Sequence, residues 1–168
     1  MKSISATPAH GVISIFTCPN YLAKAVEWAF QTQFQHFQID WQTSEIESNV
    51  LCASLTWNSI HGTAARLTSE LLKIPGLRFE LTELSPAIGH HERFAFTPNL
   101  GLLRCDMDAA GNSIFNENQL QAMLIENPNP LNLPAAINRL LGVEWDRELD
   151  TYRGLPQMQN LKLLNAVG

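Results

Sequence analysis

Apolar residues recur along the first half of the chain with two different periods. A period of two marks half-buried strands, a continuous apolar run marks a buried strand, and a period near 3.6 marks a helix that buries one face. By these criteria the sequence predicts strands at residues 12–16, 37–41, 51–57 and 77–81 and helices at residues 21–34 and 64–74. The resulting βαββαβ order over residues 11–84 is typical of a ferredoxin-like arrangement.

A ferredoxin-like sheet has its first and third strands at the centre and both helices on one face. We therefore expect odd-numbered apolar side chains such as Leu55 and Phe79 to face the helices and to belong to the core. The even-numbered polar side chains share the opposite face, which is solvated, covered by the second half of the chain, or used for recognition.

Because tryptophans in apolar registers dominate packing, four are expected in the core: Trp28, Trp41, Trp57 and Trp145.

The second half of the chain has a different pattern. Short apolar segments between residues 93 and 115, separated by turns rich in Pro, Gly and Asn, predict a meander of three strands. Asn116 is expected to cap the next helix, Pro134 to start another, and Gly142 to end it. We therefore expect a single α+β domain. Its parts are a loose arm at residues 1–10, the βαββαβ half at 11–84, the meander with C-terminal helices at 85–153, and a tail at 154–168.

Composition and charge place the chain among globular proteins. Of its 168 residues, 45% are hydrophobic and 16% are charged, and the formal net charge is −5. The apolar runs are too short to span a bilayer, and the N-terminus lacks the pattern of a signal peptide, so we expect a cytoplasmic protein with no membrane partner. Basic residues are scattered, which argues against binding to nucleic acid.

The sequence lacks the familiar catalytic and cofactor motifs. It contains no Walker A, GxGxxG, GxSxG, HExxH or EF-hand pattern, so we expect no catalytic residue and no cofactor. Cys18, Cys52 and Cys105 are widely spaced and are expected to be reduced and buried. The run His90–Glu92 is expected in a solvated loop, where adjacent side chains point to opposite faces, so we expect no metal site.

Several short segments follow one another in a characteristic order between residues 11 and 153. They are Val26–Ala29, Leu55–Asn58, Leu77–Glu83, Arg93–Phe94, Gly142–Asp146, Leu149 and Tyr152–Arg153. In this order they resemble the actinobacterial domain-of-unknown-function family 3145. The longer N-terminal arm departs from the family pattern, as does Leu84, where a more acidic turn is expected. The resemblance implies a cytoplasmic actinobacterial protein and brings no activity, cofactor or site residue.

Two classes of function are consistent with these observations. The first is a non-enzymatic binding or regulatory module that contacts a larger protein, which the lack of catalytic motifs and the two-part domain favour. The alternative is a small-molecule sensor or enzyme that uses a cleft between the two halves, because ligand sites often lie between packed parts of a protein.

The fourth predicted strand supplies candidate contact residues for a protein partner. In a βαββαβ sheet this strand is an edge, whose unpaired N–H and C=O groups can pair with a partner strand while flanking charges set the register. The candidates are Arg78, Glu80 and Glu83, together with Arg153. In the competing interpretation, the meander at residues 93–115 extends the sheet and covers this edge.

Overall fold

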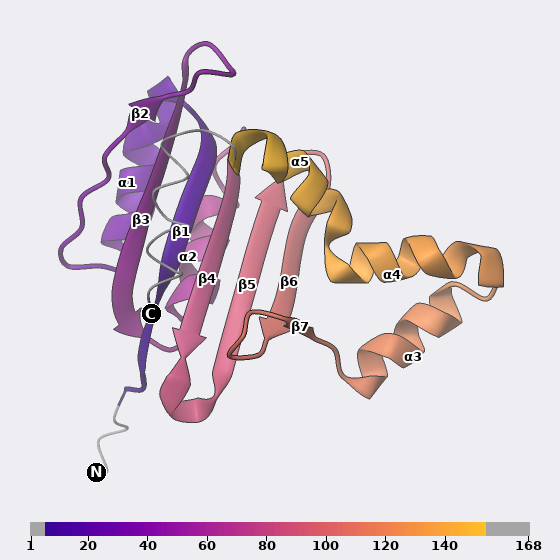
Figure 1. Cartoon of the computed structure of the whole chain (residues 1–168). Coiled ribbons are helices and arrows are strands. Elements are labelled where there is room, and N and C mark those ends of the chain that lie inside the picture. The colour runs from indigo at the N-terminus through magenta and orange to yellow at the C-terminus, as the bar shows by residue number, and fades with distance from the viewer. Residues whose placement is uncertain (1–5, 154–168) are drawn as a thin grey trace.

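The computed structural model describes residues 6–153, and in this part of the chain the predicted α+β class is confirmed. Seven antiparallel strands form one sheet in the order β2-β3-β1-β4-β5-β6-β7 (Figure 1). The strands are β1 (Pro8–Pro19), β2 (Gln42–Thr43), β3 (Val50–Ile60), β4 (Arg78–Ser85), β5 (His90–Thr97), β6 (Gly101–Met107) and β7 (Ser113–Ile114). The expected tail and residues 1–5 of the expected arm lie outside the described residues.

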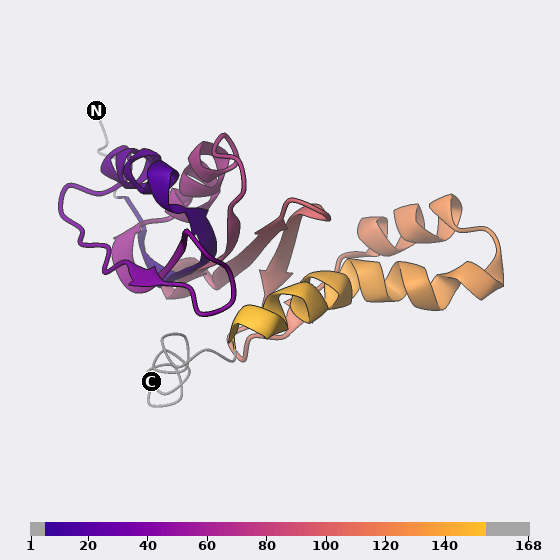
Figure 2. The ribbon, with the colours of Figure 1, turned by 90° about the horizontal axis from the view of Figure 1, so that it is seen from above.

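Helices lie on both faces of the sheet and extend beyond it (Figure 2). α1 (Ala23–Gln31) and α2 (Thr63–Leu71) lie side by side on one face, and α5 (Val143–Arg153) crosses the opposite face. α3 (Glu117–Glu126) and α4 (Leu133–Leu141) form a hairpin that projects away from the sheet. Short 3-10 helices are η1 (Asn20–Leu22), η2 (Pro86–Ile88) and η3 (Pro130–Asn132). Among residues 6–153, no helix has the length and apolar character needed to cross a membrane.

The larger hydrophobic core lies between the sheet and helices α1 and α2. Phe79 and Leu81 of β4 are fully buried in it, as their odd register predicts. Trp57 of β3 lies across Gly11 of β1, where an added Cβ atom would come within 2.8 Å of the indole and 1.8 Å of the Thr82 carbonyl oxygen. Position 11 therefore requires glycine, because a core side chain and a neighbouring strand occupy the space that a side chain would need.

A smaller core forms on the opposite face, beneath α5. The buried residues of this core are Phe16, Cys52, Ala95, Leu103, Trp145, Leu149 and Tyr152. The last three line one side of α5 at helical spacing, and the indole N–H of Trp145 donates to the carbonyl of Gly101 at 2.9 Å. The second half of the chain thus covers part of the even-numbered face.

Within the described residues the three cysteines are free and buried, as predicted, and burial raises the pKa of each thiol.

The strand expected at residues 37–41 is not formed, and pairing begins only at the two-residue strand β2. Phe37, Ile39 and Trp41 alternate with polar residues because one side of an extended segment packs against the larger core. Phe37, for example, lies against Phe30 with ring centroids 5.5 Å apart. Alternation reports one-sided burial, which does not require a hydrogen-bonded neighbour strand.

The fourth strand, β4, is not an edge of the sheet. It pairs with β5 from Phe79 opposite Phe96 to Ser85 opposite His90, so backbone groups on this side of the strand are already used. The competing interpretation, in which the meander extends the sheet, is therefore confirmed, and β4 does not offer a free edge to a partner strand. η2 reverses the chain directly after β4, which places the run His90–Glu92 in a strand rather than in the expected loop.

Other local expectations have mixed outcomes. Asn116 caps α3 through a reciprocal pair of hydrogen bonds with Gln119, and Gly142 ends α4 with a φ of 78°, both as predicted. β1 begins at Pro8, so the end of the loose N-terminal segment expected at residues 1–10 belongs to the sheet. Trp28 is 65% exposed on α1 and is not a core residue, because the apolar face of this helix is formed by other positions.

Replacing Leu81 by alanine should lower the free energy of unfolding by about 2–5 kcal/mol, the usual loss for truncating a fully buried leucine. Leu55 faces the same core but is only half-buried at its margin, so Leu55→Ala should cost less. Urea denaturation of the two variants measures both losses. Equal losses would contradict the difference in burial between the centre of the core and its margin.

Candidate functional site

Three of the four candidate contact residues lie on the face of the sheet that α5 covers. Arg78 and Glu80 leave β4 on this face, and Arg153 reaches it from the last turn of α5. Glu83 is separated from them because its odd register places it on the opposite face, at the start of α2. The structure therefore distributes the candidates over two different environments.

Glu80 and Arg153 belong to a set in which two arginines share two carboxylates. Glu80 accepts hydrogen bonds from Arg93 at 2.8 Å and from Arg153 at 2.5 Å. Asp146 accepts from the same two arginines at 2.5 and 3.1 Å. Burial opposes the charged form, but the carboxylates of Glu80 and Asp146 outweigh it and raise the pKa of both arginines above its usual value. These charged pairs join β4 and β5 to α5.

Arg78 belongs to a neighbouring set that also holds α5. Its Nε donates to Glu148 of α5 at 2.9 Å, and its guanidinium carbon lies 5.5 Å from the centre of the Tyr152 ring. The hydroxyl of Tyr152 donates to Glu47 at 2.6 Å. Burial, and then this bond to a carboxylate, raise the pKa of Tyr152 to about 12. Arg78, Glu80 and Arg153 thus use their charge within the chain.

Replacing Glu80 by glutamine should loosen α5, because Arg153 would lose its charged link to β4 and keep only the carboxylates of α5 itself, Asp146 and Asp150. A hydrogen bond to a charged group contributes about 1.5–3 kcal/mol, and we expect a loss of that order in urea denaturation. Amide hydrogen exchange in residues 143–153 should also become faster. Glu70→Gln is the control, because Glu70 forms its ion pair with exposed Lys73 on the helix surface. Unchanged exchange in α5 would show that these pairs do not hold the helix.

Glu83 is fully buried and takes the place of an N-terminal cap for α2. Its carboxylate accepts hydrogen bonds from the backbone N–H groups of Gly62 at 2.7 Å and Ala64 at 2.8 Å. α2 has no side-chain cap of its own, so the carboxylate satisfies donors that would otherwise lack partners and faces the positive end of the helix dipole. His61 Nδ1 lies 2.9 Å from the same carboxylate and 3.1 Å from Ser85 Oγ.

Glu83→Gln should cost about 1.5–3 kcal/mol of unfolding free energy, since the amide offers one acceptor oxygen where two backbone donors need partners. Glu70→Gln makes the same chemical change in an exposed ion pair and should cost less than about 1 kcal/mol. Thermal unfolding of the two variants, measured side by side, compares the losses. If Glu83→Gln were no worse than Glu70→Gln, α2 would not depend on the buried carboxylate.

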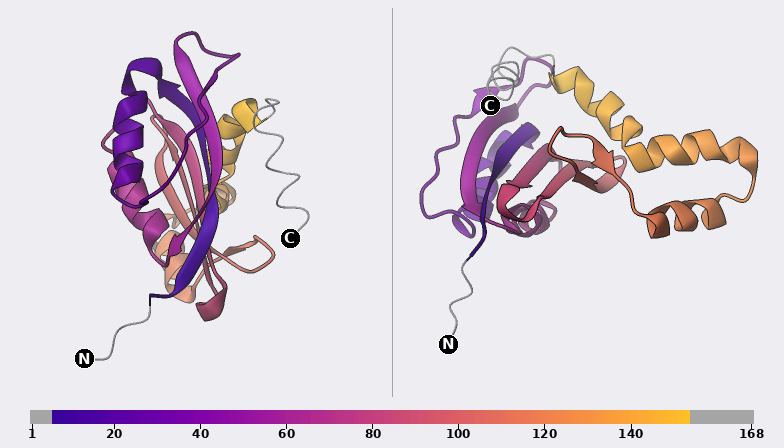
Figure 3. Two further views of the ribbon diagram at one scale, coloured as in Figure 1. Left: turned by 90° about the vertical axis from the view of Figure 1, so that its left-hand side faces the viewer. Right: turned by 60° about the horizontal axis from the view of Figure 1, so that its bottom comes forward.

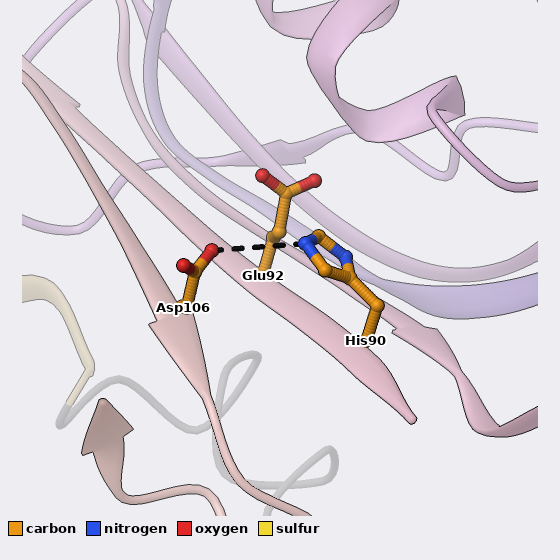
Figure 4. A group of neighbouring side chains, drawn as sticks. All are labelled: His90, Glu92 and Asp106. Carbon is orange, nitrogen blue, oxygen red and sulfur yellow. Dashed lines mark ion pairs between the residues drawn. The ribbon is translucent and has the colours of Figure 1, made fainter. Parts of the chain in front are cut away.

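A histidine and two carboxylates lie together next to His61, on β5 and β6 (Figure 4). His90 and Glu92 are two residues apart on β5 and so point to the same side, and Asp106 of β6 lies directly opposite Glu92. Their three ligand atoms lie within 4.8 Å of one another. His91 points to the other face, as its position in an extended segment predicts. Imidazole and carboxylate are groups that could hold a divalent metal ion.

This group was not expected from the sequence, because residues 90–92 lacked the alternating pattern of a strand and resembled a loop. The spacing of His90 and Glu92 is the signal that could have found part of it, since residues i and i+2 of a strand share one face. Asp106 could not have been found in this way, because its position depends on the register between β5 and β6.

The hairpin of α3, η3 and α4, residues 117–141, forms an arm in which no residue is buried. Figures 2 and 3 show that it extends away from the sheet. Large apolar side chains are exposed on it, among them Ile125 by 79% and Leu131 by 85%. The arm therefore presents apolar surface that residues 6–153 do not cover.

A groove of about 640 Å³ lies between the arm and β6. Its apolar lining consists of Leu102, Leu103, Phe115, Ala122, Met123, Ala136, Leu140 and Trp145. Arg139 also lines the groove, with its guanidinium carbon 5.8 Å from the centre of the Trp145 ring. A groove formed by two helices and a strand can accept the apolar side of an amphipathic helix from another protein.

A second hollow lies between the two halves of the chain. It has a volume of about 570 Å³ and is lined by Gly11, Trp57 and Thr82 of the first half and by residues 107–111 of the second half, among others. This volume falls within the range of pockets that bind small molecules.

Comparison with known proteins assigns the chain to a family. Residues 12–166 match the model of the family described as "Protein of unknown function (DUF3145)", and the chain belongs to this family. No curated protein matches the chain. Among solved structures, it is similar to "LarC2, the C-terminal domain of a cyclometallase involved in the synthesis of the NPN cofactor of lactate racemase, apo form". That match has 11% identity and a TM-score of 0.28, covers 67% of this chain and 76% of the other, and supports no functional argument.

Proposed function

We propose that this member of the DUF3145 family is a non-enzymatic binding or regulatory module that contacts a larger protein. The observation that carries the proposal is the arm, which contains no buried residue and lies beside an apolar groove. Its helices have 10 and 9 residues, and helices shorter than about 12 residues are marginal in water without tertiary packing. A bound partner would supply that packing.

The proposed occupant of the groove is an amphipathic helix of the larger protein. Its apolar side would lie against Met123, Leu140 and Trp145 and would add a third helix to the hairpin. Arg139 is exposed beside the groove, and its neighbour Glu144 is 4.0 Å away, at the limit of an ion pair. Arg139 and Arg104 give the groove two positive charges against the one negative charge of Glu126, which favours an acidic residue along the flank of the bound helix.

Ala122→Arg should abolish partner binding, because the new side chain would fill the groove without removing any existing contact of the core. Gln121→Arg is the matched control: it places the same side chain and charge on the adjacent exposed residue, which does not line the groove. Immobilised untagged protein captures the partner from a native lysate, mass spectrometry identifies it, and binding of that purified partner is then compared between the two variants.

Retention of the partner by Gln121→Arg and its loss from Ala122→Arg would support the groove as the contact surface. Equal binding by both variants would reject the groove. Circular dichroism at 222 nm shows whether the arm remains helical in each variant, so that a loss of binding is not confused with unfolding.

The hollow between the two halves favours the alternative, a small-molecule sensor or enzyme. Gly11, Trp57 and the turn at residues 107–111 would contact the ligand there. Native mass spectrometry distinguishes the two functions. A stoichiometric small molecule that survives purification, with no protein partner, would favour the alternative.

Three finer assignments accompany the proposal. The order β2-β3-β1-β4, with the first and third strands central, supports a ferredoxin-like first half. The resemblance to an actinobacterial family supports an actinobacterial source and a place in the cytoplasm. The scattered basic residues and the net charge of −5 support a protein partner rather than nucleic acid.

A further inference from the structure

The group of His90, Glu92 and Asp106 lies outside the arm, and the proposed function does not use it. Nε2 of His90 is 3.8 Å from an oxygen of Asp106, and all three ligand atoms lie within 4.8 Å of one another. Ligand atoms bound at about 2.1 Å from one metal ion stand roughly 3–4 Å apart. Small side-chain rotations would therefore bring the three atoms onto a common ion.

Carboxylates outnumber fixed cations around this group. Glu83, Glu92 and Asp106 are cross-strand neighbours on one face of the sheet, and in residues 6–153 Arg104 is the one arginine or lysine that pairs with any of them. Two nitrogens of Arg104 contact the same oxygen of Glu92, Oε1, which leaves Oε2 for another partner. The side chain of Glu92 is otherwise buried, where an uncompensated charge is costly. A divalent cation would compensate Asp106 and bind the free oxygen of Glu92.

His90 lacks the partners that a half-buried imidazole normally has. Its Nδ1 is buried and makes no hydrogen bond within the part of the chain that the structure describes. Its Nε2 is too far from Asp106 for a hydrogen bond. The ring packs edge-to-face against His61, with centroids 5.1 Å apart, and His61 is itself held by Glu83. Packing thus holds the imidazole beside two carboxylates, although no hydrogen bond from residues 6–153 accounts for its position.

We infer that His90, Glu92 and Asp106 form a binding site for one divalent transition-metal ion, of which Zn²⁺ is the representative. An imidazole combined with two carboxylates suits first-row transition ions, whereas Ca²⁺ and Mg²⁺ prefer oxygen ligands alone. Three protein ligands leave a coordination position open to water. The ion would join β5 to β6 through a direct cross-strand pair, Glu92 and Asp106.

Metal titration of the full, untagged chain tests the site. After dialysis against a chelator, the protein is titrated with Zn²⁺ by calorimetry and with Co²⁺ by visible absorption. We expect one ion per chain, and we expect His90→Gln and Asp106→Asn each to weaken binding at least tenfold, since loss of even an outer-shell partner costs about 10–100-fold. His36→Gln and Asp40→Asn remove the same groups from exposed positions elsewhere and should leave the affinity unchanged.

Three results would overturn the inference: no saturable binding, equal affinity in the ligand and control variants, or an intense thiolate-to-cobalt absorption band, which would place the ion at a cysteine. Circular dichroism tests whether His90→Gln and Asp106→Asn fold. Both residues are partly exposed, so we expect both variants to fold. If one variant unfolds, the other still tests the site. Ala122→Arg leaves the three ligands in place. If that variant loses the protein partner but still binds the metal ion, the groove and the metal site are independent. Either proposal can then fail without the other.

Discussion

The pairing of β4 with β5 is the constraint on which the rest of the structure depends. It gives β4 a hydrogen-bonded neighbour at each edge, while one face of β4 is buried in the larger core and the other is partly buried beneath α5. On one face Phe79 and Leu81 build the larger core, and Glu83 caps α2. On the other face Arg78 and Glu80 hold α5. One strand thereby fixes the positions of two helices that lie on opposite sides of the sheet.

This arrangement separates charges that the fold uses from groups that it leaves unsatisfied. The arginines and carboxylates between α5 and the sheet are mutually paired, so their charge is already used within the chain. Around His90, in contrast, carboxylates exceed fixed cations and the imidazole lacks hydrogen bonds within residues 6–153. The arm likewise exposes apolar side chains that no described element covers. Buried polar groups are normally satisfied and apolar patches normally covered, so these two regions are where ligands are to be sought.

The short helices show how unevenly tertiary packing is distributed along the chain. α5 has 11 residues, and it is anchored by Trp145, Leu149 and Tyr152 and by two sets of ion pairs. α3 and α4 are of similar length but have caps and no buried side chain. Local signals such as the Asn116 capping box and Gly142 define where these helices begin and end, while the packing needed to stabilise them would come from a partner.

The sequence by itself determined the α+β class, most elements of the first half, the meander and the caps of the arm, because period and capping are local properties that neighbouring residues decide. It did not determine that residues 37–41 would stay unpaired, since one-sided burial produces the same alternation as a strand. Only the structure decided that β5 pairs with β4, because residues 90–92 lack the apolar alternation by which a strand is recognised in the sequence. The register between β5 and β6 brought Asp106 to His90 and Glu92, and the packing of α5 on the sheet gave Arg78, Glu80 and Arg153 their partners within the chain.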